Sequence, residues 1–210
     1  MKSPPLLEVC NLSIGILKED AWVTATHNLN FVISQGESIG LVGESGCGKS
    51  LTAQSIMRLL PLPNIKVLSG EIKFNGDDIL ALKSNDLRSI RGNKIAIIFQ
   101  EPMTALNPVL TIGNQILEQV RIHNPRQAKK TLKQYVIDLL ADVGIDFPKQ
   151  RFHSYPHQLS GGMRQRVMIA MAISCKPDLI IADEPTTALD VTLQAQILTL
   201  LKDLQKKYNT

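Results

Sequence analysis

The chain has 210 residues, of which 44% are hydrophobic and 20% charged, a composition typical of a globular protein with one sizeable core. Its net charge is +4, no apolar run approaches the ~18 residues that suggest a membrane span, and the N-terminus lacks the apolar segment of a signal peptide. Three widely spaced cysteines without a Cys-x-x-Cys pair argue against a disulfide framework or a zinc site.

The first third of the chain is predicted to form strands and turns. Apolar residues alternate with polar ones at Leu29, Phe31 and Ile33, which indicates a half-buried strand, and the same alternation recurs at 72–74. Continuously apolar runs are instead typical of parallel strands covered on both faces, in an α/β architecture. These runs are 39–42, 95–99 and 179–182.

A glycine-rich octapeptide of the pattern G-x-x-x-x-G-K-[ST] follows the run 39–42 directly. Glycines let backbone N–H groups point at phosphates, and a helix that begins near Lys49 adds the positive end of its dipole. The Lys49 ammonium can reach the β- and γ-phosphates, and the Ser50 hydroxyl can ligate Mg²⁺. By itself the loop predicts binding of a nucleoside triphosphate. The residues predicted to bind it are Gly43, Glu44, Ser45, Gly46, Cys47, Gly48, Lys49, Ser50 and Leu51.

The middle of the chain has a helical pattern. Apolar residues recur at three- and four-residue steps over 128–143, and Gly144 stands where a C-terminal cap belongs. A second stripe of this kind covers 193–204. The densest basic stretch, 121–133, could form a nucleic-acid patch, but its helix-like spacing with a single nearby aromatic residue favours a solvated face.

The apolar run 179–182 ends in two adjacent carboxylates. Because successive side chains of a strand point in opposite directions, Asp183 and Glu184 are expected to do different work. Asp183 is placed to hold Mg²⁺ through water, and Glu184 is placed to polarise an attacking water as general base. The alternative, a strand end that is acidic by chance, is disfavoured by the Pro-Thr-Thr-Ala-Leu-Asp continuation that ends at Asp190.

The sequence LSGGMRQR at 159–166 resembles the LSGGQ signature of the ABC ATPase family, with Met163 where that motif usually has Gln. The order of phosphate loop, Gln100 after a buried strand, signature, acidic strand end and Asp190 also matches, and the resemblance covers nearly the whole chain. It implies an α/β fold: a P-loop NTPase core of mostly parallel strands, an antiparallel N-terminal β subdomain and an inserted α-helical subdomain. One nucleotide-binding domain over 1–210 would then comprise a β-rich region with the phosphate loop (1–100), the helical subdomain (101–165), and a region with the acidic strand end (166–210).

The resemblance also implies roles in the hydrolysis of ATP with Mg²⁺. Gln100 would contact Mg²⁺ or the attacking water and act with Lys49 and Glu184 in catalysis, although a polar strand end is the plainer interpretation of Gln100 alone. Ser50, Gln100 and Asp183 are the expected Mg²⁺ ligands.

In the family, the helix N-terminus at the signature faces the γ-phosphate bound by a second ATPase domain, where an anion suits it. Asp190 would touch the opposite domain's site. The Trp22 ring is the candidate for stacking on adenine, with half-buried packing as the alternative. The signature residues in this role are Ser160, Gly161 and Gly162.

The segment 101–108 closely resembles importers of the oligopeptide, dipeptide and nickel group, as do 155–160 and 181–191. This implies an ATPase subunit, peripheral on the cytoplasmic face of the inner membrane, that energises uptake of peptides or a related small solute. Its partners would be a second ATPase domain, transmembrane permease subunits and an extracytoplasmic solute-binding protein, with no nucleic acid.

The kind of parent protein stays open. The stretch 59–96 looks most like the first half of tandem-ATPase peptide importers, while a single-domain subunit of a homodimeric or heterodimeric importer is the other possibility. Outside transport, the alternatives are a soluble ABC ATPase and a catalytically impaired fragment that binds nucleotide.

None of the four histidines follows Asp190. ABC ATPases carry a switch histidine on the strand after the helix that starts at this point, so the resemblance implies a chain truncated after that helix. Such a chain is expected to bind nucleotide, to turn it over slowly and to be less stable.

Overall fold

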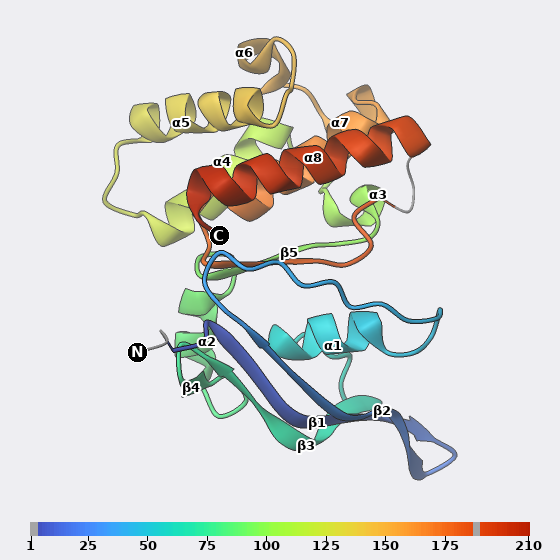
Figure 1. The fold of residues 1–210 in the computed structure, drawn as a ribbon. Coiled ribbons are helices and arrows are strands. Elements are labelled where there is room, and N and C mark those ends of the chain that lie inside the picture. Colours follow the sequence, from blue (N-terminus) through green and yellow to red (C-terminus); the bar gives the residue numbers. More distant parts are fainter. Residues whose placement is uncertain (1–3, 187–189) are drawn as a thin grey trace. The chain divides into compact units, whose positions relative to one another are not determined.

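The computed structural model describes residues 4–186 and 190–210, apart from the side chains of Pro102 and Met103. The chain forms two compact units, Met1–Arg88 and Ser89–Thr210 (Figure 1). Among the helices of the described residues, none is both long and apolar enough to cross a membrane.

The first unit is built on an antiparallel sheet with the strand order β2-β1-β3-β4. Its apolar side chains alternate as the sequence predicts, since Ile33, Ile72 and Phe74 are buried and Leu29 and Phe31 are partly buried. The strands are β1 (Leu7–Lys18), β2 (Ala21–Ile33), β3 (Ile65–Phe74) and β4 (Asp77–Asp78).

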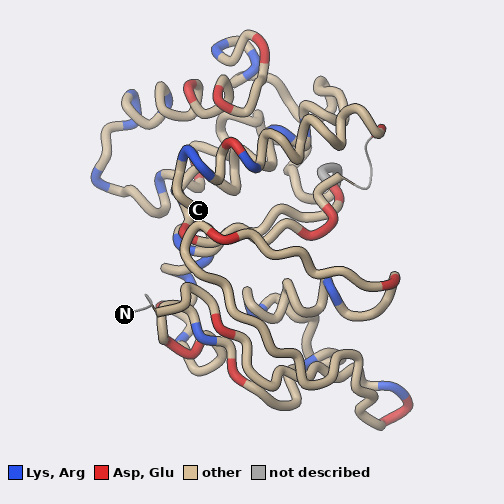
Figure 2. The backbone as a smooth tube through the Cα atoms, viewed as in Figure 1, with Lys and Arg blue, Asp and Glu red and all other residues tan. Residues whose placement is uncertain are grey.

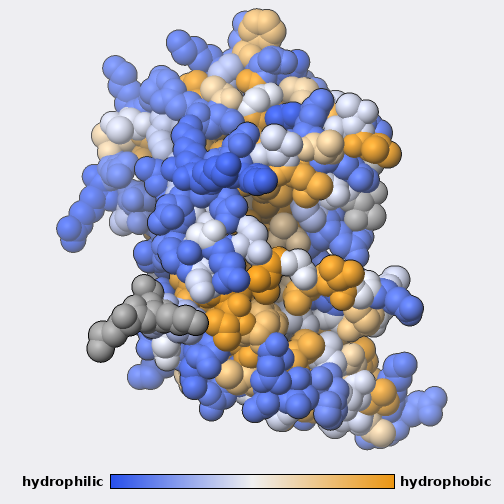
Figure 3. Space-filling view, in the orientation of Figure 1, coloured by the Kyte–Doolittle hydropathy of each residue, from blue (hydrophilic) through white to orange (hydrophobic). Residues whose placement is uncertain are grey.

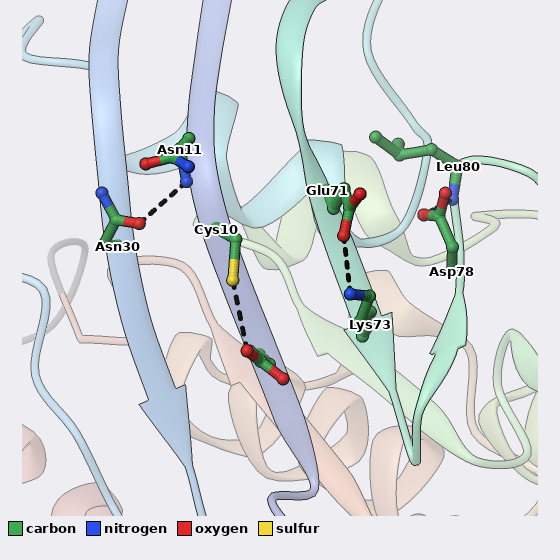
Figure 4. Close-up of polar contacts among 8 residues, drawn as sticks. Cys10, Asn11, Asn30, Glu71, Lys73, Asp78 and Leu80 are labelled. Carbon is green, nitrogen blue, oxygen red and sulfur yellow. Dashed lines mark hydrogen bonds and ion pairs between the residues drawn. The ribbon is translucent and has the colours of Figure 1, made fainter.

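One face of this sheet carries the polar contacts that the close-up in Figure 4 draws. Cys10 Sγ donates to Glu8 Oε1 at 3.3 Å, and Lys73 forms an ion pair with Glu71 at 2.6 Å. The two pairs face each other across β1 and β3, with Glu8 opposite Lys73 and Cys10 opposite Glu71. Val9, between them in sequence, is 1% exposed, because alternate residues of a strand point to opposite faces.

Helix α1 (Lys49–Ile56) follows the phosphate loop and buries Thr52, Ala53 and Ile56 within the first unit. Helix α2 (Ser84–Ile90) buries Leu87 and continues past Arg88, where the first unit ends. The helix expected to begin near Lys49 is therefore confirmed.

The prediction of a covered parallel strand at 39–42 is wrong for this structure. The segment has no strand pairing, and Ile39, Leu41 and Val42 are 40%, 44% and 97% exposed. An apolar run reports a tendency toward burial, but a strand also needs a neighbour that offers complementary backbone groups, and that neighbour is not encoded locally.

The second unit holds the other two predicted parallel strands. β5 (Ile95–Ile98) pairs in parallel with β6 (Leu179–Ala182), from Ile95 opposite Leu179 to Ile98 opposite Ala182. β5 is largely buried, as expected, whereas in β6 only Leu179 is buried and Ala182 is exposed. The prediction that both faces of the strand are covered therefore describes β5 better than β6.

Helices make up the rest of the second unit, and both predicted helical stripes are confirmed. Gly144 has a φ of +76° just beyond α5, as expected of a C-terminal cap. The helices are α3 (Pro102–Ala105), α4 (Ile112–His123), α5 (Lys129–Asp142), α6 (Pro148–Arg151), α7 (Gly161–Ile173) and α8 (Val191–Tyr208). Helices α4, α5, α7 and α8 share one core that includes Ile116, Val136, Leu140, Ile169 and Ile197.

The surface of the helical region is polar where the sequence predicts a solvated face. Basic residues line the end of α4, the connecting loop and the start of α5 (Figure 2), and hydrophilic residues cover α5 and the C-terminal half of α8 (Figure 3). At the ends of these two helices, Lys207 and Tyr208 both contact Asp142 Oδ2, at 2.7 and 2.9 Å.

Candidate functional site

At two positions of the phosphate loop, the main chain has a conformation that only glycine adopts readily. Gly46 and Gly48 have φ values of +81° and +93°, in the left-handed region. Gly48 also lies against β2, because a Cβ built on it would be 2.2 Å from Thr26 Cγ2. The loop therefore seats closely on the sheet and turns directly into α1.

Lys49 lies over this loop. Its Nζ donates to Gly43 O and to Glu44 O, both at 2.9 Å, so the cation is held by main-chain carbonyls. α1 begins at Lys49 with no acidic residue in its first turn and no side-chain cap from Gly48. Its first N–H groups and a nearby ammonium favour an anion at this end of the helix.

Trp22 lies at the start of β2, with 36% of its surface exposed. Lys66 Nζ is 4.1 Å from its ring centroid, a cation–π contact that covers one ring face. Stacking of Trp22 on adenine stays a prediction, and no pattern in the sequence signals the Lys66 contact.

In the second unit, Gln100 and Glu184 lie together although 84 positions separate them in sequence. Gln100 Nε2 donates to Glu184 Oε2 at 2.8 Å. The parallel pairing of β5 and β6 causes this, since both residues follow the carboxyl ends of paired strands, and Asp183 N also donates to Ile98 O at 3.0 Å. Asp183 and Glu184 are both partly buried, and Glu184 has a φ of +47°.

The signature and the residue after the acidic strand end both start helices. Ser160 caps α7, its hydroxyl oxygen accepting from Met163 N at 3.3 Å. Asp190 caps α8, with Oδ1 accepting from Leu193 N at 2.9 Å. Both are exposed, so their local role as helix caps is compatible with contacts to a second molecule.

Gln165 is a buried polar residue that the sequence motifs do not single out. It is 1% exposed and donates from Nε2 to Pro185 O at 2.7 Å. A signal was available, because Gln165 precedes Ile169 by four residues and Ile173 by eight, and therefore shares the buried face of α7.

The expected metal ligands Ser50, Gln100 and Asp183 offer hydroxyl, amide and carboxylate oxygens. Oxygen donors with few carboxylates suit Mg²⁺, which keeps several waters and binds substrate phosphates. Within 4–186 and 190–210, no group of three or more His, Cys, Asp or Glu side chains could hold a metal ion. Each of these three side chains therefore offers a donor of a type that fits Mg²⁺ held jointly with a nucleotide.

The predicted residues divide between the two units. Trp22 and the loop 43–51 lie in the first unit, and the second contains Gln100, Asp183, Glu184, Asp190 and the signature. Of the expected catalytic residues, the structure brings Gln100 and Glu184 into contact.

Residues 26–187 match the ABC transporter family. AppD, an oligopeptide transport ATP-binding protein of Bacillus subtilis, is 53% identical over 98% of this chain and 62% of its own length. DppD, a dipeptide transport ATP-binding protein of Escherichia coli, is 50% identical over 97% of this chain and 62% of its own length. The chain thus spans about three fifths of the curated relatives it matches.

Among solved structures, the dimeric ATP-binding cassette MJ0796 in a post-hydrolysis state with ADP and Pi superposes with a TM-score of 0.83 and 28% identity. The superposition covers 96% of this chain and 83% of the cassette. The cbiO1 protein of Clostridium perfringens, part of the cbiONQ ABC transporter complex, gives a TM-score of 0.79 at 26% identity, over 99% and 76% of the two chains. These likenesses agree with the predicted P-loop α/β fold.

Proposed function

The chain belongs to the ABC transporter family, and on that premise we propose that it binds Mg-ATP at the loop 43–51 and hydrolyses it to drive import of peptides or a related small solute. The observation that carries the proposal is the seating of Lys49 over a glycine loop at the start of α1. The names of the peptide-transport relatives support the solute class.

In this proposal the phosphates take the place of the carbonyls of Gly43 and Glu44 as acceptors for Lys49. A doubly charged metal ion bound with the nucleotide would neutralise charge on the β- and γ-phosphates, held by Ser50, Asp183 and Gln100. Glu184 accepts a proton from the attacking water as general base. Its contact with Gln100 keeps the carboxylate oriented, and so favours a fixed position for that water.

A second ATPase domain is part of the proposal, because Ser160 and Gly161 are exposed at the N-terminus of α7. We expect two full-length domains to close head-to-tail over ATP. Glu184→Gln should prolong the closed state by slowing hydrolysis, which light scattering with and without Mg-ATP would detect. A protein that stays monomeric at saturating ATP would contradict this assembly.

The permease is proposed to dock on 101–108, at the cytoplasmic face of the membrane, and a solute-binding protein would deliver the solute outside. Thr104, Asn107 and Pro108 are exposed there, whereas Leu106 is buried and anchors the segment. Cysteine cross-linking from Asn107 to the permease is the expected result. Cross-links that form only from other surfaces would remove this segment from the interface.

Phosphate release by the full-length protein tests the enzymatic core of the proposal. Lys49→Ala should abolish most Mg-ATP turnover, because the loop loses its cation. Lys83→Ala, which removes an exposed lysine of the same unit outside the loop, should leave turnover unchanged. Equal turnover in wild type and Lys49→Ala would show that ATP is not hydrolysed at this loop.

A further inference from the structure

Helix α7, which begins at the signature and is called the signature helix below, contacts the segment that follows Glu184. Gln165 Nε2 donates to Pro185 O at 2.7 Å from a position that is 1% exposed. One turn earlier, Gly162 lies against α8, since a Cβ built on it would be 3.3 Å from Leu193 Cδ1. α7 therefore contacts this stretch of the chain on both sides, at Pro185 and at the first turn of α8.

Glu184 has a backbone conformation that needs such support. A φ of +47° is in the left-handed region, which is unfavourable for residues other than glycine. The residue before a proline is restricted further. Pro185 has no N–H, so its carbonyl is the backbone group through which a hydrogen bond can hold it. That carbonyl is the acceptor for Gln165.

We propose that Gln165 is a positioning residue for Glu184. By fixing Pro185 O, it keeps Glu184 in the conformation in which the carboxylate contacts Gln100 at 2.8 Å. The proposal rests on the proposed function, in which Glu184 is the general base. It adds that the signature helix, whose N-terminus is proposed to face the partner domain's nucleotide, also orients the base of its own domain.

Removal of this hydrogen bond should lower kcat and leave nucleotide binding nearly intact. Gln165→Met keeps the length of the side chain and removes its donor. In the full-length protein we expect kcat for ATP to fall about 10-fold or more, since small misplacements of reacting groups cost up to about 10²-fold. KM should stay within about 2-fold, because the interaction acts on the chemical step.

Tyr135→Phe is the matched control. It removes the hydrogen bond that Tyr135 Oη, on α5, donates to Ser174 O at 2.8 Å. Ser174 caps the C-terminal end of α7, whereas Gln165 lies near its N-terminal end. We expect kcat to be unchanged in this variant, when both variants are assayed well below their measured unfolding temperatures. An equal loss of kcat in Tyr135→Phe and Gln165→Met would overturn the proposal, because any weakening of α7 would then suffice.

The Glu184→Gln background separates positioning from general weakening. If Gln165 acts through Glu184, Gln165→Met should reduce the residual turnover of Glu184→Gln no further. A further 10-fold loss in the double variant would contradict the positioning role. If Glu184→Gln alone retains wild-type turnover, the general base of the proposed function is wrong. If Glu184→Gln hydrolyses ATP slowly and Gln165→Met hydrolyses it at the wild-type rate, only the positioning role of Gln165 is wrong, and the proposed function stands.

Discussion

In the phosphate loop of Met1–Arg88, the main chain sets the positions of the functional groups, whereas around Glu184 in Ser89–Thr210 side-chain hydrogen bonds set them. Lys49 is held by two loop carbonyls, and Gly48 supplies a conformation and a close approach to Thr26 that other residues lack. Glu184 is held instead through Gln100 and, at the next residue, through Gln165.

This difference has a consequence for how each region responds to substitution. Apart from the close approach to Thr26, the loop depends on residues that are neighbours in sequence, so most substitutions that damage it lie within the loop itself. The Glu184 carboxylate depends on its own segment, on Gln100 after β5 and on Gln165 of α7, so substitutions far away in sequence affect its position. We therefore expect substitutions in the loop to weaken nucleotide binding and, with it, turnover, and substitutions around Glu184 to lower turnover alone.

The largest effect is expected at Glu184. Glu184→Gln should lower ATP turnover by about 10²–10⁴-fold, the usual contribution of a positioned general base. Phosphate release by the full-length protein measures this. Glu118→Gln, an equivalent change at an exposed position of α4, should have no effect. Retained turnover in Glu184→Gln would break the comparison, because the second region would then supply no base.

A smaller effect is expected at Gly48. Gly48→Ala forces a Cβ against Thr26 at a φ of +93°, which should destabilise the first unit by about 1–3 kcal/mol. Gly40→Ala is the control, since a Cβ there meets no atom within 4 Å. Thermal unfolding should show a lower midpoint only for Gly48→Ala, and Thr26→Ser should restore some of the loss by removing the methyl group. Identical midpoints for both alanine variants would refute the argument from the main chain.

The smallest effect is expected at Asp142, whose side-chain contacts lie away from Glu184. Burial acts to raise the pKa of the Asp142 carboxyl, but hydrogen bonds from Lys207 and Tyr208 outweigh it and hold that pKa below its usual value. The ionised form therefore contributes stability above the ordinary pKa of about 4, and this is lost as pH falls through the lowered value.

Asp142→Asn should cost less than about 1 kcal/mol at pH 7, because the pair is exposed to solvent. Urea unfolding at several pH values measures the difference from wild type. It should shrink as the solution is acidified, and turnover should not change. A difference that grows toward low pH would contradict the assignment of the pKa direction.

Sequence reasoning succeeded where a structure is encoded by neighbours along the chain. The helical spacing over 128–143, the alternation in β2 and the helix after the phosphate loop all depend on contacts within one segment, and all three are confirmed. The paired strands β5 and β6 were also predictable, because short apolar runs of this kind are typical of parallel sheets.

It failed, or made no prediction, where the outcome depends on distant segments. The run at 39–42 has no strand pairing. The prediction failed there because apolar character alone does not specify a partner strand. The bond from Gln165 to Pro185 joins α7 to the segment after β6, 20 positions away, and no local pattern encodes either this bond or the left-handed backbone of Glu184. Lys66 over Trp22 is a contact of the same kind.

Equilibrium titration of the full-length protein with a fluorescent ATP analogue and Mg²⁺ tests the division between the two regions most directly. The account predicts that Lys49→Ala raises Kd about 10-fold or more, because hydrogen bonds to charged groups contribute about 1.5–3 kcal/mol. It also predicts that Glu184→Gln binds the analogue as tightly as wild type or more tightly. An unchanged Kd in Lys49→Ala, or an equal loss of affinity in both variants, would contradict it.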